Sequence, residues 1–361
     1  MEEFSCKTKI LAGAGAISAL AELGKKRLFL VSDPYFTQTG WADKVVKSSG
    51  CPEVEIFDGV VPDPTVELAA EVTAKLRAFH PELLVALGGG SAMDLAKAMA
   101  WFSKESCLFV AIPTTSGSGS EVTDFAILTH QGVKHPLIDP AVCPDAAILD
   151  DSLLKKLPPS LIADTGFDVL AHCIEGYVAT GGSAVTWALA ESAFAAAIAA
   201  LPRSYSGVLS VRQQLHEASA MAGMAFSQAG LGACHALSHA LGGLFHLPHG
   251  RLNAIVLPAV IEANSAGCMA QYARLARAAG FSGAADTVAV RGLKNGLLRL
   301  RRELELPADL ARAGLSPAAV KRAEDQLVAA ALADPCSKSN PVPVTDAYLR
   351  HLLEEVRGDG K

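Results

Sequence analysis

The sequence lacks the patterns of a disulfide-stabilised protein and of a nucleic-acid-binding protein. Its eight cysteines are scattered and include no CxxC pair, which suits a reducing compartment. Lys and Arg form no cluster longer than Arg301-Arg302, and the formal net charge is −6. This charge pattern excludes nucleic acid and anionic membrane surfaces as expected partners.

The sequence also lacks a recognisable export leader and an uninterrupted apolar run. The chain opens Met1-Glu2-Glu3-Phe4, which is acidic where a leader would be basic. Its most apolar helical stretch, Trp187 to Leu201, contains Glu191 and Ser192. We expect this stretch to be a core helix too short to cross a bilayer. A cytoplasmic protein is therefore expected.

What the sequence does contain is enough apolar chain for two domains. Of its 361 residues, 50% are hydrophobic, and a chain of this length usually divides into separate cores. In the first part, short apolar runs end in Gly, Pro, Ser or Asp, which is typical of a parallel sheet buried on both faces. These runs are Arg27 to Val31, Leu83 to Leu87 and Leu108 to Ile112.

After Leu157-Pro158-Pro159 the strand signals fade, and Ala/Leu-rich helical patterns take over. The prolines indicate a linker. We predict an α/β domain over residues 1–157 and an all-helical domain over residues 158–361. The expected helices include Ile162 to Val178, Val185 to Leu201, Val211 to Phe226, Ala233 to Gly242 and Leu252 to Ala266.

Two loops of the first domain could bind a dinucleotide. Gly88-Gly89-Gly90-Ser91 lies between a predicted strand and a helix beginning near Ala92. Glycines let the backbone approach a pyrophosphate, and the first N–H groups of a helix point toward it. A tight strand-to-helix turn is the alternative interpretation, because the motif is not GxGxxG. Pro113 to Glu121 follows another strand and supplies five hydroxyl side chains for ribose and phosphate oxygens.

Asp33 follows the earliest clear strand. A carboxylate there could accept hydrogen bonds from an adenosine ribose and would repel a 2′-phosphate, which favours NAD over NADP. An Asp-Pro turn needs no cofactor and explains the residue equally well.

The second domain contains the residues best suited to a metal. Asp168 and His172 are four apart, so a helix places them on one face, where they could chelate one ion. Four of the ten histidines follow within fifteen residues, at His235, His239, His246 and His249. Burying several imidazoles without partners is costly. A carboxylate and three neutral imidazoles suit Fe²⁺ or Zn²⁺ and leave room for a substrate oxygen.

Four motifs together resemble those of the iron-containing, or group III, alcohol dehydrogenases, in the same order and spacing. Within that family the sequence is most similar to the 1-propanol dehydrogenases of bacterial propanediol-utilisation microcompartments, notably over Met224 to Gly232 and Phe245 to Gly250. The four motifs are GGGSxxDxAK (Gly88 to Lys97), PTTSGSGSE (Pro113 to Glu121), DxxxHxxEGY (Asp168 to Tyr177) and HxxxHxxGxxxxxPHG (His235 to Gly250).

The resemblance implies a Rossmann-like NAD-binding domain followed by an all-α metal-binding domain, a fold shared with dehydroquinate synthase. It also implies the metal ligands Asp168, His172, His235 and His249. His239 matches a histidine implicated in proton relay, whereas His246 matches no ligand. The implied cofactor contacts are Asp33, Gly89, Gly90, Ser91, Thr114, Thr115, Ser118 and, more weakly, Lys134.

The sequence departs from the family pattern at two places. Ser118 stands where many members have Thr, and it retains the hydroxyl. The segment Cys336 to Pro341 stands where relatives often have Thr-Arg-Thr-Asn-Pro. This second difference puts the packing of the C-terminal part in question and leaves the predicted site unaffected.

We therefore expect a metal-dependent, NAD(H)-linked interconversion of a small primary alcohol and its aldehyde, with reduction of propanal to 1-propanol as the expected reaction. The expected metal is Fe²⁺ or Zn²⁺. We also expect a homodimer and packaging in a microcompartment. A dehydroquinate synthase-like lyase is the alternative enzyme, but the segments around His235 and His249 are almost free of the Lys and Arg that its phosphate-bearing substrate needs. A non-catalytic NAD-binding protein with a structural metal is the third interpretation.

Overall fold

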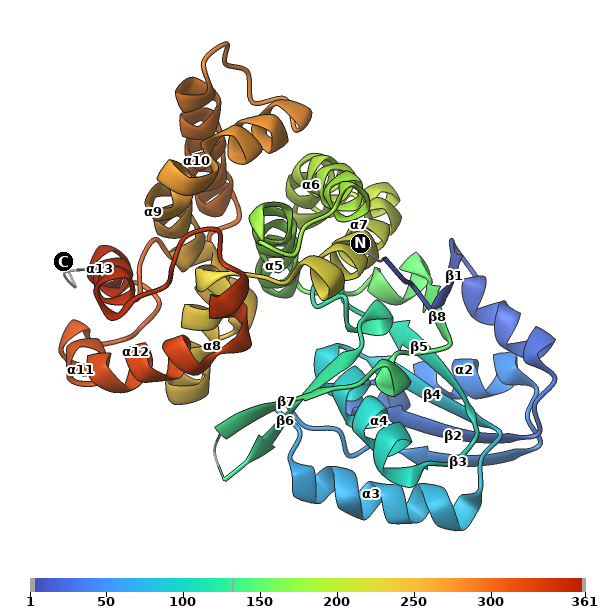
Figure 1. Ribbon diagram of the computed structural model, residues 1–361. Coiled ribbons are helices and arrows are strands. Elements are labelled where there is room, and N and C mark those ends of the chain that lie inside the picture. The colour runs from blue at the N-terminus through green and yellow to red at the C-terminus, as the bar shows by residue number, and fades with distance from the viewer. Residues whose placement is uncertain (1–3, 132, 359–361) are drawn as a thin grey trace. The chain divides into compact units, whose positions relative to one another are not determined.

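Six parallel strands organise the first half of the chain (Figure 1). The computed structural model describes residues 4–131 and 133–358 and divides the chain into a unit of Ser5–Leu157 and a second unit that begins at Pro158. The sheet has the order β1-β8-β5-β4-β2-β3, and every pairing is parallel. Its strands are β1 (Lys9–Ala12), β2 (Arg27–Ser32), β3 (Glu53–Phe57), β4 (Leu83–Gly88), β5 (Leu108–Pro113) and β8 (Ala146–Leu149).

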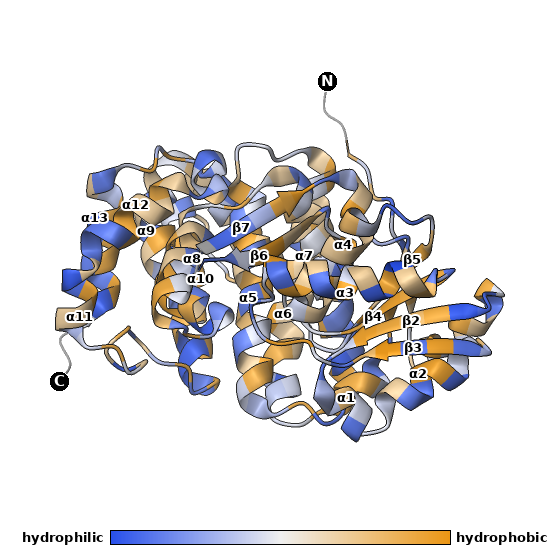
Figure 2. Cartoon of the chain, turned by 90° about the horizontal axis from the view of Figure 1, so that it is seen from below, coloured by the Kyte–Doolittle hydropathy of each residue, from blue (hydrophilic) through white to orange (hydrophobic). Residues whose placement is uncertain are grey.

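The central strands are apolar over most of their length because both faces of the sheet are covered. In β2, Phe29 and Val31 belong to one buried cluster, whereas Leu28 and Leu30 belong to another. The first cluster includes apolar residues of α3 (Val66–Phe79) and α4 (Gly90–Ser103), and the second includes residues of α2 (Trp41–Ser49). Figure 2 shows the resulting hydrophobic colour along β2 and β4.

The first unit also contains short helical turns and an antiparallel hairpin that the sequence analysis did not predict. The hairpin pairs β6 (Phe125–His130) with β7 (Val133–Ile138). Pro136 lies within β7, and proline is depleted from strands, which hides the pattern. The remaining elements are α1 (Pro34–Gln38), η1 (Ala16–Leu23), η2 (Ser120–Val122), η3 (Pro140–Val142) and η4 (Asp151–Leu154).

The strand order changes direction between β2 and β4. From β2 the chain passes outward to β3 and then returns to β4 on the other side of β2. Correspondingly, α2 packs on one face of the sheet and α4 on the opposite face. In open α/β sheets, ligands bind beyond the carboxyl ends of the strands at such a point. The residues that follow β2 and β4 therefore form the expected cofactor crevice of this unit.

The described residues of the second unit form helices and no strands. Helix α5 is almost wholly buried from Ile162 to Val178, and the polypeptide of α9 continues through a non-helical residue, Cys268. The helices are α5 (Pro159–Val178), α6 (Ala184–Tyr205), α7 (Arg212–Ala229), α8 (Ala233–Phe245), α9 (His249–Ala278), α10 (Asp286–Glu303), α11 (Pro317–Arg322), α12 (Glu324–Ala333) and α13 (Asp346–Arg357), with the short turns η5 (Leu209–Val211) and η6 (Pro335–Ser339).

The expectation that the apolar stretch near Trp187 is too short to span a membrane was wrong. Helix α6 has 22 residues, because a capping box at Ser183 starts it earlier and it continues past Pro202. Both α6 and α9 are long and apolar enough for a span by length and composition alone. Each nevertheless packs in the helical unit: Glu191 of α6 accepts from Tyr177 of α5, and Arg274 of α9 pairs with Glu191.

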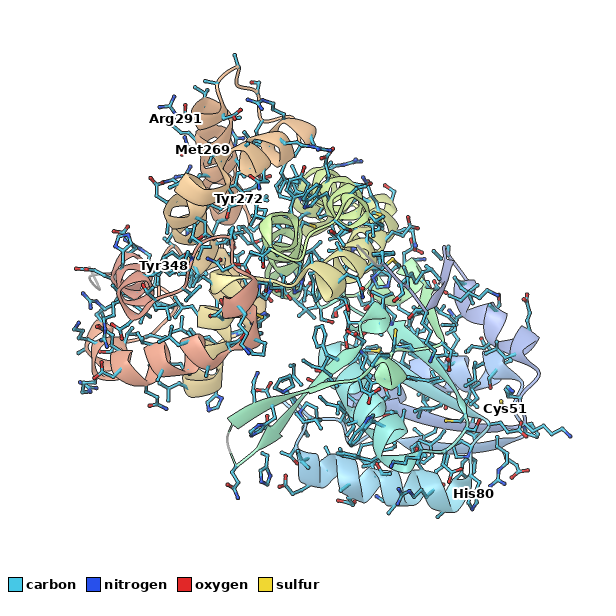
Figure 3. The ribbon with its side chains drawn as sticks, viewed as in Figure 1. Cys51, His80, Met269, Tyr272, Arg291 and Tyr348 are labelled. Atoms are coloured by element: carbon cyan, nitrogen blue, oxygen red, sulfur yellow. The ribbon has the colours of Figure 1, made fainter. Side chains whose placement is uncertain are left out.

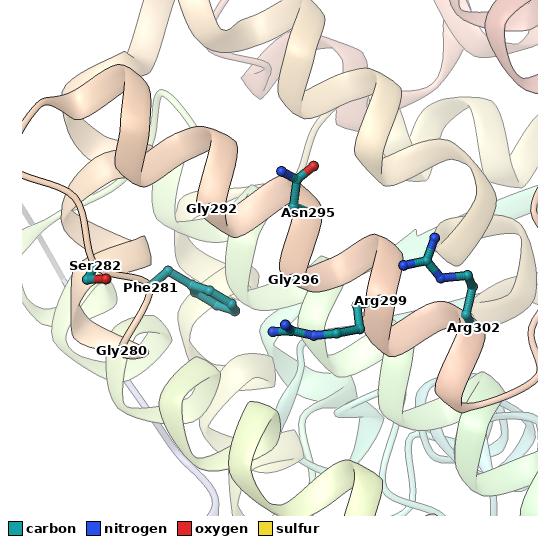
Figure 4. A pocket seen from close by; sticks show the side chains of 8 residues that line it. All are labelled: Gly280, Phe281, Ser282, Gly292, Asn295, Gly296, Arg299 and Arg302. Atoms are coloured by element: carbon teal, nitrogen blue, oxygen red, sulfur yellow. The ribbon is translucent and has the colours of Figure 1, made fainter.

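One cavity of the second unit lies apart from the predicted metal ligands. It has a volume of about 460 Å³ and lies between α10 and the segment that follows α9. Figure 4 shows Arg299 and Arg302 projecting from α10, and the Phe281 side chain on the segment that follows α9. None of the residues that line it is a predicted site residue.

Candidate metal centre and cofactor loops

Asp168 and His172 lie one turn apart on α5, as their spacing predicted. Both side chains are buried, with 6% and 4% of their residue surface exposed. The Nε2 atom of His172 lies 3.9 Å from Oδ1 of Asp168. The imidazole is held flat between two other rings, those of Phe226 and His235, at centroid distances of 4.3 and 4.6 Å.

Two further helices bring imidazoles to the same carboxylate oxygen. His235 lies in the first turn of α8, and its Nε2 is 3.7 Å from Oδ1 of Asp168. His249 is the first residue of α9, and its Nε2 is 3.6 Å from the same oxygen. Residues of three helices thus converge on one point, and α5 lies far in sequence from the consecutive helices α8 and α9.

The donor set fits a divalent first-row cation. Donor atoms that share one tetrahedral ion lie roughly 3.3–3.6 Å apart, and the observed separations of 3.6–3.9 Å are close to this spacing. The donor atoms of Asp168, His172 and His235 all lie within 4.8 Å of one another. His249 joins this group through its approach to Asp168 and remains partly exposed at 35%, so the side of the site next to His249 is the more accessible one.

Glu175 supports His235 from behind. Its carboxylate is 2% exposed and lies 2.6 Å from Nδ1 of His235, so the imidazole donates there and directs Nε2 toward Asp168. The same carboxylate accepts the backbone N–H groups of Gly232, Cys234 and His235 at the start of α8. One side chain therefore both caps the helix and orients the ligand.

A close approach between α5 and α9 requires glycine at position 250. A Cβ atom on Gly250 would lie 1.9 Å from the carbonyl oxygen of Asp164 and 3.2 Å from Cβ of Asp168. The approach is also fastened by Arg251, whose guanidinium binds the Asp164 carboxylate with two hydrogen bonds of 3.1 and 3.0 Å. This contact holds His249 beside Asp168.

The site residues carry strongly perturbed pKa values. Burial alone would raise the pKa of Asp168, but His172, His249 and His235 outweigh it and keep that pKa far below its usual range. Burial opposes protonation of His235, yet Asp168 and Glu175 raise its pKa to about 9. Burial lowers the pKa of His249. Because a cation must displace the proton of His235, metal binding is expected to strengthen as pH rises.

His239 lies beside this group, one turn after His235 on α8. Its ring stacks on that of His249 at a centroid distance of 5.0 Å. Its Nδ1 lies 2.8 Å from Oδ2 of Asp334. This hydrogen bond fixes the ring and does not involve Nε2. Burial would raise the pKa of Asp334, but the hydrogen bond and charge interaction with His239, together with hydrogen bonds from Cys336, outweigh it and lower the pKa to about 2.

The predicted cofactor residues of the first unit gather at the point where the strand order reverses. Asp33 follows β2, and its Oδ1 accepts from the N–H of Tyr35 at the start of α1. The glycines lie at the end of the neighbouring strand β4 and directly after it. Gly88 has φ +159°, and a Cβ atom there would meet Ala92 at 2.6 Å and approach the Asp33 carboxylate. Cβ atoms on Gly89 and Gly90 would fill space in front of Thr115 and Ser118, at 3.4 and 3.5 Å.

This arrangement fits a dinucleotide. Thr114 donates its backbone N–H to Gly88, so the two loops run side by side, and Ser91 lies in the first turn of α4. The backbone of Gly89 and Gly90 leaves space in front of Thr115 and Ser118 that any side chain at these positions would fill. Both predicted loops and Asp33 thus belong to one edge of one sheet.

A buried lysine ties α4 to the residues that follow the hydroxyl-rich loop. Lys97 of α4 is 0% exposed and donates to the carbonyl of Thr123, its hydroxyl and the carbonyl of Phe125 at 2.8–2.9 Å. One turn earlier on the same helix, Asp94 accepts from the hydroxyl of Ser120 at 3.0 Å. Two successive turns of α4 are therefore hydrogen-bonded to the hydroxyl-rich loop and to the residues that follow it.

Other predicted residues have different surroundings. Lys134, the predicted ribose contact, lies on β7 and pairs with Asp63 at 2.7 Å. His246 ends α8 with φ +57° and is exposed. The segment Cys336 to Pro341 contacts the start of α8, where Asn340 accepts from the N–H of Ala233.

Three supporting residues were missed by the sequence analysis. Glu175 lies within a recognised motif, seven residues after Asp168 and so on the same face of α5; that spacing could have identified it. Asp334 and Asn253 gave no signal, because their partners His239 and Asp168 are far away in sequence.

Both parts of the chain match one family. Residues 7–151 match the iron-containing alcohol dehydrogenases, and residues 162–356 match the C-terminal part of the Fe-containing alcohol dehydrogenase family. The chain is 39% identical to the 1-propanol dehydrogenase of Citrobacter freundii, covering 99% of this chain and 100% of that protein.

Solved structures agree with this match. A 1,3-propanediol oxidoreductase superposes with a TM-score of 0.93 at 29% identity, over 99% of this chain and 100% of that one. The sulfoacetaldehyde reductase of Bifidobacterium kashiwanohense, solved with NAD⁺, has a TM-score of 0.90 at 26% identity over 99% of both chains. The predicted family and fold class are confirmed: the chain belongs to the iron-containing alcohol dehydrogenase family.

Proposed function

We propose that this alcohol dehydrogenase uses NAD(H) to interconvert small primary alcohols and aldehydes, and that it reduces propanal to 1-propanol. The observation that carries the proposal is the convergence of three imidazoles on one oxygen of Asp168. Full-length similarity to a 1-propanol dehydrogenase supports the choice of substrate.

The cation is held by Asp168, His172, His235 and His249 in this proposal. When bound, it polarises the oxygen of the alcohol or aldehyde, and the nicotinamide accepts or donates the hydride. Fe²⁺ is the proposed metal. Zn²⁺ prefers the same ligand types, so the loaded metal also depends on supply.

His239 moves the alcohol proton. Because Asp334 accepts the Nδ1 proton, the unprotonated Nε2 of the neutral ring can take a proton from the substrate side and pass it toward solvent. The side chain is 31% exposed, which suits exchange with water.

The first unit holds the cofactor. Gly89, Gly90 and Ser91 bind the pyrophosphate through backbone N–H groups, while Thr114, Thr115 and Ser118 supply hydroxyls to phosphate and ribose oxygens. Asp33 binds the adenosine ribose and disfavours a 2′-phosphate. Lys134 is the weakest of the proposed contacts, because it already pairs with Asp63.

The lining near the ligands favours a small, uncharged substrate. From Ala233 to Gly250 the chain contains four histidines and no Lys, Arg, Asp or Glu. A phosphorylated or carboxylated substrate would need cationic partners there, so a dehydroquinate synthase-like reaction is disfavoured. Dimer formation and packaging in a microcompartment stay predictions.

The test is metal-dependent oxidation of NADH with ethanal, propanal, butanal and hexanal, using protein prepared anaerobically and loaded with Fe²⁺ or Zn²⁺. Activity that peaks at propanal supports the substrate. Loading without turnover of any aldehyde or alcohol would indicate a structural metal and contradict the proposal.

Two variants separate the proposed roles. His249→Ala is expected to lose both metal and turnover, because it removes a ligand. His239→Ala is expected to keep the metal, measured by elemental analysis, and to lose activity. Equal metal loss in both variants would show that His239 is a ligand and not a relay.

A further inference from the structure

A buried asparagine lies among the proposed ligands without being one of them. Asn253 is four residues after His249 on α9, so the two side chains share one face of that helix. It is 0% exposed. A primary amide in such a place is costly unless both of its ends make hydrogen bonds.

The nitrogen end of Asn253 faces the carboxylate of Asp168. Nδ2 lies 2.7 Å from Oδ1 of Asp168 and 3.2 Å from Nε2 of both His235 and His249. An amide has only two hydrogens, so it cannot donate to all three of these atoms. The shortest contact, to the charged acceptor, is the strongest of them.

The oxygen end of Asn253 faces a thiol. Sγ of Cys234 lies 3.5 Å from Oδ1 of Asn253 and 3.8 Å from its backbone oxygen. A flipped amide would place its oxygen against the Asp168 carboxylate and its N–H group against sulfur. The observed orientation is the one that pairs a donor with an acceptor at both ends.

We propose that Asn253 is a positioning residue for the proposed metal centre: its amide holds the Asp168 carboxylate with Oδ1 toward the three imidazoles, and the Cys234 thiol holds the amide. The inference rests on the proposed function, since it concerns the same cation. Without the amide, the carboxylate is free to turn and a buried acceptor loses its partner.

The magnitude follows from the contact of the amide with an oxygen of a proposed ligand. Removal of a partner of this kind lowers metal affinity by roughly 10–100-fold. The affinity of the protein for Zn²⁺, measured in competition with a chelator, is therefore expected to fall by that factor in Asn253→Leu, which keeps the branched shape without the donor. The visible spectrum of the Co²⁺-loaded protein is expected to change, because the carboxylate no longer has one fixed orientation.

Three companion variants make the experiment specific. Asn253→Ala introduces no larger side chain, so it replaces Asn253→Leu if the Leu variant does not fold. Cys234→Ser keeps a donor for Oδ1 of Asn253 and is expected to retain wild-type affinity. Asn264→Leu is the matched control: Asn264 is a buried asparagine on the same helix, and it binds Asn340 and Tyr348, the latter labelled in Figure 3.

The control variant is expected to lower the melting temperature and to leave Zn²⁺ affinity and the Co²⁺ spectrum unchanged. Wild-type affinity and spectrum in both Asn253 variants would overturn the inference. Equal loss in Asn264→Leu would overturn it as well, because the effect would then be general weakening of α9. The proposed function fails instead if the wild-type protein binds no Zn²⁺, or if its Zn²⁺ binding persists in His249→Ala.

Discussion

Glu121 gives the sharpest test of the electrostatics of the cofactor-binding unit. It lies in η2, is 2% exposed, and its Oε1 accepts no hydrogen bond from the described residues. Burial raises its pKa to about 7, although Lys97 opposes the rise. The folded unit therefore holds a proton on Glu121 that the unfolded chain has already released above its ordinary pKa of 4.5.

The sign follows from this difference in bound protons. Where the folded state binds more protons than the unfolded state, the free energy of unfolding falls as pH rises. The fall due to Glu121 runs from about pH 4.5 to about pH 7. Its size is about 3 kcal/mol, because each pKa unit corresponds to about 1.4 kcal/mol.

The substitution Glu121→Gln keeps the shape and removes the charge. Relative to the parent, it is expected to be neutral near pH 4.5 and stabilising by about 3 kcal/mol near pH 8. Urea unfolding measures this best in a Trp187→Phe background, in which the remaining tryptophans, Trp41 and Trp101, report only on the first unit.

A matched control is Glu71→Gln, because the Glu71 side chain is 64% exposed and pairs with Lys75. It is expected to change stability little at any pH. A stability difference for Glu121→Gln that is constant with pH, or that favours the parent at high pH, would refute the reasoning.

Three further predictions concern the site. Glu175→Gln should lower Zn²⁺ affinity by roughly 10–100-fold in a chelator competition, because the partner of His235 Nδ1 is lost; unchanged affinity would reject that role. Asp33→Ser should raise the ratio of kcat/KM for NADPH over NADH by roughly tenfold or more, since repulsion of a 2′-phosphate is removed, and a constant ratio would argue against the contact. Gly250→Ala should lower both the melting temperature and metal occupancy, because its Cβ atom collides with Asp164; a variant as stable and as metal-rich as the parent would contradict this.

The sequence predicted the central strands well and the helix ends poorly. The runs at Arg27, Leu83 and Leu108 became β2, β4 and β5 with one residue added at the end of each, because burial on both faces leaves a continuous apolar signal. Helix ends depend on caps. Helix α5 begins at Pro159, since proline fits the first position, and α9 continues past its expected end through the distortion at Cys268.

The candidate site was predictable only in part from spacing. The interval between Asp168 and His172 identified a chelating pair, but four histidines between residues 235 and 249 offered no physical reason to exclude His239 or His246. Their different surroundings depend on where α8 ends and α9 begins. The family resemblance supplied that distinction.

The arrangement of ligands on three helices has a consequence for the lifetime of the protein. A cation bound by the proposed ligands would add a crosslink between α5 and the consecutive helices α8 and α9, which lie far from α5 in sequence. Binding to the folded state alone would add about 2.7 kcal/mol of stability at a free metal concentration one hundred times the Kd. In a cell short of metal, the helical unit would therefore unfold and be degraded more often, so metal supply would set the amount of enzyme as well as its activity.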